Sequence, residues 1–298
     1  MLAKTQGSSE PIDLAVADRA GALLPPAWVG DLVSRGSEFA LTSARIADAA
    51  EMDAKTLEAG VAEAYAGIAA KVKNLGANRP VRLWNHIPGI HDRMDGRRDR
   101  YMVFNAGRYR AFAAWYGGLA AFDRDVATAA GVGHDGRDLV IHCLSARAAG
   151  LAVENPRQVA PHRYSTRYGP VPPCFARATV LAEPGMILVG GTASIRGEDS
   201  LHADSLPRQV RETLTNLASV AEAAHRIMGP ASDGRPRGGW LRSYRELRVY
   251  HPRARDAEPL VRALRETFGA ACGIETMRAD LCRAELLVEI EGLARVGT

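Results

Sequence analysis

The order of predicted strands and helices repeats between the two halves of this chain, and this repeat constrains the fold more than any single motif. Each half contains apolar strands and helices with one apolar face, with a break between the halves at residues 147–151. This mixture predicts an α+β fold in which helices pack against each sheet. A length of 298 residues agrees with about two domains, which we expect at residues 1–150 and 151–298.

Hydrophobic periodicity and turn residues predict the individual elements. The strongest helix prediction covers residues 207–228, where Val210, Leu214 and Leu217 share one face. Further helices are predicted at residues 42–73, 101–115 and 256–268. Strands are predicted at residues 80–87, 138–146, 176–181, 186–190, 246–250, 275–283 and 286–291. Loops are predicted at residues 129–133, 191–197 and 231–239.

Charge and composition narrow the class of protein. The chain has 38 Lys and Arg, 34 Asp and Glu, and no long basic run, which argues against nucleic-acid binding and favours a small anionic ligand. No apolar run reaches the length of about 18 residues that a membrane span needs, and residues 1–14 lack the apolar core of a signal peptide. Cys143, Cys174, Cys272 and Cys282 have no CxxC spacing. We therefore expect a cytoplasmic protein with reduced thiols, either a monomer or a small homo-oligomer.

Residues 154–177 concentrate groups that bind anions. A guanidinium offers two parallel donors to a carboxylate, and a tyrosine hydroxyl adds a donor without charge. For any one arginine, an ion pair on the surface is the better interpretation, but the clustering favours a binding site. The candidate residues of this segment are Asn155, Arg157, Gln158, Tyr164, Arg167, Tyr168 and Arg177.

The stretch Gly190-Gly191-Thr192-Ala193-Ser194 allows two interpretations. Glycine permits close approach of the backbone to a ligand, with the hydroxyls of Thr192 and Ser194 as donors. An ordinary turn with a hydroxyl cap is an equal alternative. The stretch is not a phosphate-binding loop, because no lysine follows at the required place.

Two carboxylates share one face of the last predicted strand, Glu289 and Glu291, while Val288 and Ile290 share the other. If one carboxylate is buried, desolvation raises its pKa and makes it a general acid near neutral pH. A solvated sheet face is the alternative. Cys282 by itself predicts only a small buried side chain.

Other catalytic chemistries have no support in the sequence. The eight histidines show neither HxH nor HxxxH spacing, so we expect no metal site. None of Ser145, Ser165 and Ser194 lies in a GxSxG motif, so a hydrolase elbow is not predicted. We expect no cofactor.

Together these segments resemble the chorismatase family, which cleaves the enolpyruvyl ether of chorismate. The second half also resembles the RidA/YjgF proteins, in its helix at residues 209–217 and its ending with Glu289 and Glu291. The resemblance implies two RidA/YjgF-like modules, each a mixed sheet packed with helices, and a site in the second module near the junction. The blocks that carry the chorismatase resemblance are residues 81–90, 104–108, 154–159, 168–170, 175–178, 191–195 and 288–291.

The resemblance implies roles for named residues. Glu289 is expected to protonate the enolpyruvyl methylene carbon, and the Arg and Tyr residues of 157–177 to hold the two carboxylates of chorismate. A cysteine seven residues before the acid, here Cys282, is typical of the branch that forms 3-hydroxybenzoate and pyruvate.

Several alternatives stay open. Within the family they are hydrolysis to 3,4-dihydroxycyclohexa-1,5-diene carboxylate and a mixture of 3- and 4-hydroxybenzoate. From another class they are a RidA-like imine deaminase and a small-molecule binder without activity.

Overall fold

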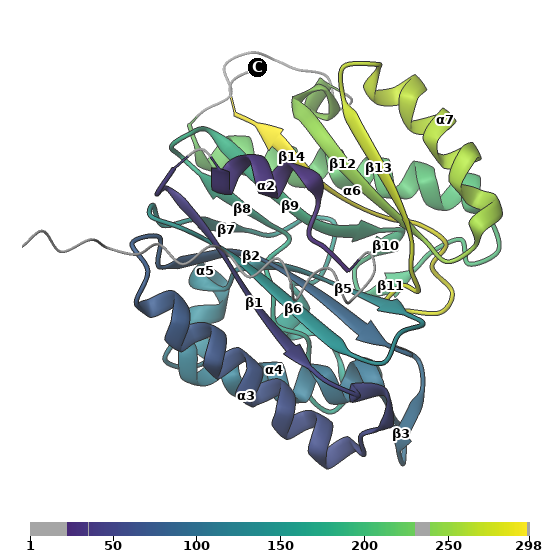
Figure 1. The fold of residues 1–298 in the computed structure, drawn as a ribbon. Coiled ribbons are helices and arrows are strands. Elements are labelled where there is room, and N and C mark those ends of the chain that lie inside the picture. The colour runs from purple at the N-terminus through teal and green to yellow at the C-terminus, as the bar shows by residue number, and fades with distance from the viewer. Residues whose placement is uncertain (1–22, 35, 230–238, 297–298) are drawn as a thin grey trace, which may run out of the picture.

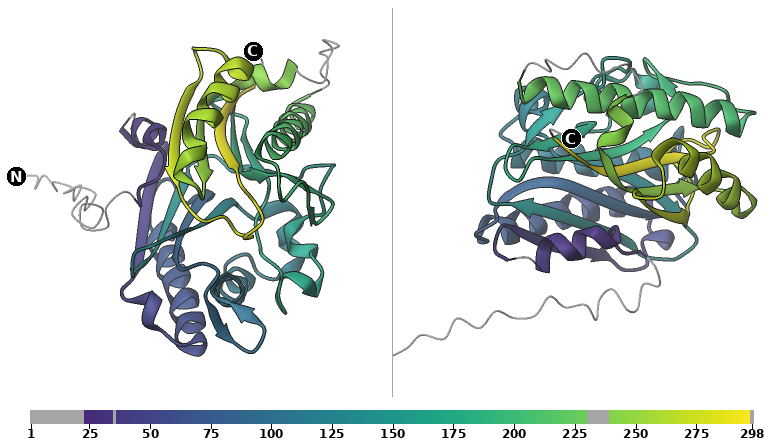
Figure 2. Two further views of the ribbon diagram at one scale, coloured as in Figure 1. Left: turned by 90° about the vertical axis from the view of Figure 1, so that its right-hand side faces the viewer. Right: turned by 90° about the horizontal axis from the view of Figure 1, so that it is seen from above.

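Two sheets lie face to face between two layers of helices (Figures 1 and 2). Helices α3 (Ala54–Lys73) and α4 (Arg100–Trp115) cover the outer face of the first sheet. Helices α6 (Leu206–Ile227) and α7 (Ala257–Phe268) cover the outer face of the second. The prediction of an α+β fold with helices packed on each sheet is confirmed. The computed structural model describes residues 23–34, 36–229 and 239–296.

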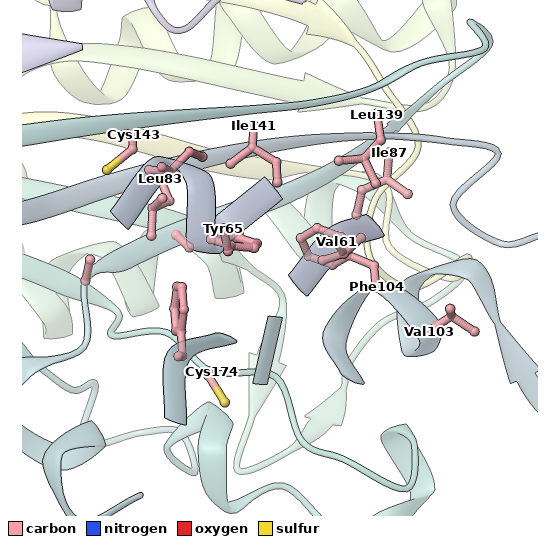
Figure 3. Packing of buried hydrophobic residues seen from close by; sticks show 14 of the residues in the cluster. Val61, Tyr65, Leu83, Ile87, Val103, Phe104, Leu139, Ile141, Cys143 and Cys174 are labelled. Atoms are coloured by element: carbon pink, nitrogen blue, oxygen red, sulfur yellow. The ribbon is translucent and has the colours of Figure 1, made fainter. Parts of the chain in front are cut away.

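Strand β2 shows why the first sheet has two different faces. Its side chains alternate, so Leu83 and Ile87 point toward α3 and α4 and join their apolar cluster (Figure 3). Arg82 and Trp84 point the other way, toward the second sheet. β2 is antiparallel to β6 and parallel to β5. The first sheet has the strand order β1 (Phe39–Ile46), β6 (Leu139–Ala146), β2 (Arg79–Pro88), β5 (Thr128–His134).

The crossing of α3 and α4 depends on Gly107. A Cβ at this position would lie 2.5 Å from the carbonyl oxygen of Glu58 and 2.8 Å from Cβ of Val61, both in α3. Any side chain larger than that of glycine would therefore push the helices apart. This close contact fixes the position of α4, which carries Tyr101 and Arg108.

Strand β14 has a central place in the second sheet, antiparallel to both β12 and β9. Leu217, Val220 and Ala224 of α6 form the apolar face that packs against this sheet, as the sequence predicts. The second sheet has the strand order β13 (Gly273–Arg278), β12 (Tyr244–His251), β14 (Glu289–Arg295), β9 (Met186–Ala193), β8 (Ala178–Leu181), β7 (Leu151–Val153).

The layer between the sheets is partly apolar and partly polar. Trp28 of α2 packs edge-on against Trp84, with ring centroids 5.9 Å apart, and Leu188 and Leu293 of the second sheet join the same cluster. The inner face of β14 also carries charged residues, described below. The remaining elements are α2 (Ala27–Ser34), β3 (Arg93–Asp95), β4 (Arg98–Asp99), α5 (Phe122–Asp125), β10 (Ile195–Arg196) and β11 (Asp199–Ser200).

The helix prediction at residues 42–73 begins too early, because residues 39–46 form β1 and pair with β6. Helix α3 begins only after Asp53, whose Oδ1 accepts a hydrogen bond from the N–H of Thr56 at 2.7 Å. Such an N-cap stabilises a helix by about 1 kcal/mol. The Ala-rich stretch hides this boundary, since alanine favours helix on both sides of the cap.

Two loop predictions are also wrong. Residues 129–133 belong to β5, and their small side chains reflect close packing: a Cβ at Gly131 would lie 3.2 Å from the ring of Tyr101. Residues 191–193 continue β9 into the site, and Ile195–Arg196 pairs with β11. The predicted loop at 231–239 lies outside the described residues, except for Gly239 at the start of a 3₁₀ helix.

The last two strands have other boundaries than predicted. β13 ends at Arg278 and β14 starts at Glu289, so residues 279–288 form a connection. Asp280 in this connection bridges to Gly133 of β5, which draws the connection away from the second sheet toward the first. As a result, Cys282 lies in the connection and not on a strand. The other predicted strands and helices are confirmed, with boundaries shifted by a few residues.

Candidate active site

A cavity of about 390 Å³ opens where β5, β9 and the start of β14 meet α4 and the connection before β14. Both halves of the chain therefore contribute to its wall. The sequence-predicted residues that line it are Tyr164, Tyr168, Arg177, Gly191, Cys282 and Glu289.

Glu289 is a buried carboxyl group at the cavity, with 4% of its surface exposed. Burial, followed by the nearby charge of Glu291, raises its pKa to about 8, while Arg82 and Arg177 act in the opposite direction. The acid is therefore mainly protonated at neutral pH. This agrees with the prediction that a buried carboxylate of this strand becomes a general acid.

Gly191 makes room for this carboxyl group. It lies on β9 beside the first residues of β14, and a Cβ at position 191 would lie 2.0 Å from Oε1 of Glu289. Real Cβ atoms do not approach an oxygen this closely, so the carboxyl group occupies the space that a side chain at position 191 would need. The glycine thus has a role in placing the acid.

Glu291 is held by side chains from two other strands, β2 and β12. Its carboxylate forms an ion pair with Arg82 of β2, accepts a hydrogen bond from Nε1 of Trp84 at 2.8 Å and another from the hydroxyl of Tyr250 on β12 at 3.0 Å. Only 1% of its surface is exposed. Glu289 and Glu291 thus share one strand face, as predicted, but have different surroundings.

Cys282 lies in the connection before β14, at the wall of the cavity. Burial, with a further contribution from the nearby Glu289, raises the pKa of its thiol to about 12. The thiol is therefore protonated at neutral pH and can donate or relay a proton, but it is not a ready nucleophile.

Arg177 brings a buried guanidinium to the cavity. One terminal nitrogen donates to the hydroxyl of Tyr164 at 2.7 Å and to the carbonyl of Val159 at 3.1 Å. Its Nε is buried without a hydrogen bond to the described residues and lies 3.9 Å from Oε2 of Glu154. Burial raises the pKa of Glu154 to about 7, although the charge of Arg177 lowers it.

Tyr168 lies against a second arginine. The guanidinium of Arg283 stacks 3.8 Å from the centre of the Tyr168 ring and donates to the carbonyl of Glu198 at 2.8 Å and to the hydroxyl of Ser200 at 3.0 Å. This stacking holds both side chains at the cavity wall.

Sequence reasoning missed two residues of α4, Arg108 and Tyr101. Arg108 is 1% exposed, lines the cavity and donates to Oδ1 of Asn105 at 2.7 Å, and its Nε has no hydrogen bond to the described residues. Tyr101 also lines the cavity. The block 104–108 was a signal for Arg108, but an arginine among apolar helix residues gives no indication of what it faces.

Six predicted site residues do not line the cavity, because each already has partners elsewhere. Arg157 pairs with Glu212 and Asn216 of α6, and Arg167 is an exposed residue that pairs with Asp199. The side chains of the four others donate hydrogen bonds to backbone carbonyls. The donor and acceptor residues are Asn155 and Asn216, Gln158 and Ile195, Thr192 and Gly190, and Ser194 and Leu201. For Arg157 and Arg167, the alternative of ion pairing within the chain describes the geometry.

The described part of the chain has no group of three or more His, Cys, Asp or Glu side chains placed to hold a metal ion. Within the same residues, no helix combines the length and apolar character needed to cross a membrane.

Comparison with known proteins adds independent findings. A family model described as "Chorismatase FkbO/Hyg5-like, N-terminal" matches residues 30–145. A 3-hydroxybenzoate synthase from Streptomyces hygroscopicus is 34% identical over 238 residues, which cover 77% of this chain and 67% of that protein. The crystal structure of a chorismatase matches with a TM-score of 0.75 and 28% identity, covering 87% of this chain and 75% of the other. A Rid-family protein from Yersinia pestis matches 50% of this chain and 100% of its own at 18% identity and a TM-score of 0.36.

Proposed function

Because this chain belongs to the chorismatase family, we propose that it converts chorismate into 3-hydroxybenzoate and pyruvate. One observation carries the proposal: a carboxyl group that is protonated near neutral pH, Glu289, faces a cavity that also contains buried arginines. The relative named 3-hydroxybenzoate synthase supports this product over the hydrolytic one.

The substrate has two carboxylates, and we assign them to Arg108 and Arg177. Each guanidinium lines the cavity, and each has a buried Nε that makes no hydrogen bond within the described residues. Phe175 contacts both, with its ring centre 5.7 Å from the guanidinium carbon of Arg108 and 5.3 Å from that of Arg177. Both guanidiniums therefore lie beside one ring at the cavity, where each can serve one carboxylate of the substrate.

Glu289 then donates its proton to the methylene carbon of the enolpyruvyl group. An oxocarbenium ion forms at the ether carbon, the bond between the ether oxygen and the ring breaks, and pyruvate leaves. The neighbouring ring hydroxyl oxygen closes on the ring carbon that lost the ether, which gives an arene-oxide-like intermediate. The hydroxyl proton returns to Glu289. The intermediate reopens when the bond from its oxygen to the carbon that carried the hydroxyl breaks. The carbon that lost the ether then loses its hydrogen as a proton and the oxygen gains one, which gives 3-hydroxybenzoate. The atoms balance without water, since chorismate equals 3-hydroxybenzoate plus pyruvate.

A product-resolved assay of the purified protein tests the proposal. We expect equal amounts of pyruvate and 3-hydroxybenzoate from chorismate, measured by a coupled lactate dehydrogenase assay and by chromatography. Pyruvate with the dihydroxycyclohexadiene carboxylate would instead assign the hydrolytic reaction. An imine deaminase or a binder without activity would release no pyruvate, and that result would contradict the proposal.

Cys282→Ala should change the product ratio more than the rate of pyruvate release. The neutral thiol lies at the cavity wall, where it can donate or relay a proton during ring opening, after the bond to pyruvate has broken. We expect the share of 3-hydroxybenzoate to fall and other products to rise. Cys272→Ala is the control, because Cys272 is buried in the α6 and α7 side of the second sheet. An unchanged ratio in Cys282→Ala would remove Cys282 from the mechanism.

Gly191→Ala should slow the reaction by about tenfold to 100-fold, since a misplacement of about 1 Å has effects of this size. The added Cβ would meet Oε1 of Glu289 at 2.0 Å, so the acid must move. Gly67→Ala on α3 is the matched control, because a Cβ there meets nothing within 4 Å. Rates and melting temperatures of both variants should be compared. Full activity of Gly191→Ala would contradict the placement of Glu289.

A further inference from the structure

We propose that Glu291 is a positioning residue for the acid: its buried negative charge keeps the proton on Glu289, and its partner Arg82 limits that effect. The inference rests on the proposed role of Glu289 as the proton donor. It assigns the inter-sheet polar cluster, defined as Glu291, Arg82, Trp84 and Tyr250, a function beyond holding the two sheets together.

The geometry separates the two carboxyl groups by function. They lie at positions i and i+2 of β14, on one face and about 7 Å apart along the strand. The carboxylate of Glu291 accepts hydrogen bonds from Arg82, Trp84 and Tyr250, and Glu291 does not line the cavity. The carboxyl group of Glu289 lines the cavity and makes no hydrogen bond with the described residues. A fixed charge therefore lies beside an acid that is free to transfer its proton.

The charged groups that shift the pKa of Glu289 act in opposite directions. Arg108, Arg283 and Glu285 line the same cavity but are not among these groups. Glu291 on the same strand disfavours a second negative charge, whereas Arg82 from β2 and Arg177 beside β8 favour it. The thiol of Cys282 and the buried hydroxyls of Tyr101 on α4 and Tyr250 on β12 are neutral at neutral pH, because burial raises their pKa. The protonation of Glu289 thus depends on burial and on the balance of these three charges.

Two substitutions should move the pH profile in opposite directions. Activity needs protonated Glu289, so it falls as the pH rises through the pKa of this group, about 8. Glu291→Gln removes the negative charge and leaves Arg82 unpaired, so the loss should begin at lower pH. Arg82→Met removes the positive charge, so the loss should begin at higher pH. A unit charge about 7 Å away at an effective dielectric constant of about 20 corresponds to a shift of about one to two pH units.

The experiment is kcat/KM for pyruvate release from chorismate at pH 5 to about 10, which reports the ionisation of the free protein, for the full chain and each variant. Arg82→Lys keeps the charge and should restore the wild-type profile. Arg100→Met is the matched control: it removes another buried arginine, one at the start of α4 that pairs with Asp92 and does not act on Glu289. In this variant, the loss of activity at high pH (the descending limb of the pH profile) should begin at the same pH as in the wild type.

A structural role alone would lower the melting temperature without moving the limb. If the limb stays in place in both Glu291→Gln and Arg82→Met, the proposal is overturned. If Glu291→Gln does not fold, Arg82→Met against Arg82→Lys decides the question, and the carbonyl stretch of protonated Glu289 in infrared difference spectra gives a second readout. Failure of the proposed function is distinguishable, because the wild-type protein would then release no pyruvate.

Discussion

Glu289→Gln should lower the rate of pyruvate release from chorismate by about 10²–10⁴-fold, the usual contribution of a positioned general acid. Glutamine has nearly the same size, so it fits beside Gly191 without a new contact. Its amide has no proton acidic enough to give to a carbon atom. Because Glu289 has no hydrogen-bond partner among the described residues, the substitution leaves no buried group newly unpaired, and the fold should be retained.

The control for this variant is Glu258→Gln, which changes a carboxylate on α7 that is 85% exposed. It should keep the wild-type rate. Steady-state rates and thermal melts of the three proteins separate catalysis from stability. Activity of Glu289→Gln within threefold of the wild type would remove this residue from the mechanism and favour a different class of reaction.

Arg177→Met should lower kcat/KM for chorismate by about 10²–10³-fold, since the loss of a buried charged donor to a carboxylate has effects of this size. Methionine retains part of the apolar volume beside Phe175 and Tyr164. The protein should still fold, because Glu154 has a pKa near 7 even beside Arg177 and becomes neutral when that charge is removed. The effect should lie mostly in KM.

Arg167→Met is the control that separates the structure from the sequence prediction. Arg167 belongs to the same segment, but it is exposed and pairs with Asp199 and Glu198. It touches the cavity only through Tyr168, to whose hydroxyl it donates at 2.7 Å. Its substitution should leave kcat/KM nearly unchanged. A large loss in Arg167→Met together with a small one in Arg177→Met would contradict the assignment of the carboxylate-binding arginine.

The shared face of the two carboxylates was predictable because a strand has a simple rule, whereas the choice of Glu289 as the acid came from the resemblance. Alternation places Glu289 and Glu291 on one face whatever else the chain does, and their apolar neighbours in the sequence suggest that the strand is buried. The difference between the two was not predictable. It depends on Arg82, Trp84 and Tyr250, which are distant in the sequence and meet Glu291 only after the sheets pack face to face.

Arginines were harder to assign, because their side chains are long and take the nearest partner. Arg157 and Arg177 belong to the same segment of the sequence, but α6 presents Glu212 and Asn216 to Arg157 and nothing comparable to Arg177. Arg108 was missed for the opposite reason. It lies on a helix whose packing, through Gly107, decides which residues face the cavity.

The fold was predicted best where one pattern acts alone. The apolar face of α6 is visible in the sequence, and so is β2. The apolar residues of β2 that precede the turn residues Pro88-Gly89 are Val81, Leu83, Trp84 and Ile87. The strand β1 was mistaken for the start of α3, because its pairing with β6 is a long-range interaction, whereas the Ala-rich stretch that follows favours helix locally. Tertiary pairing overrides such a local preference.

The contact between Gly191 and Glu289 has a consequence for how such sequences can change over time. A methyl group at position 191 and a carboxyl group at position 289 compete for one volume, although nearly a hundred residues separate them in the chain. A mutation that enlarges residue 191 is therefore harmful while the acid is present and becomes harmless once it is lost. Among descendants of such a protein, we expect the two positions to change together, with a side chain at 191 marking the lineages that have given up proton transfer.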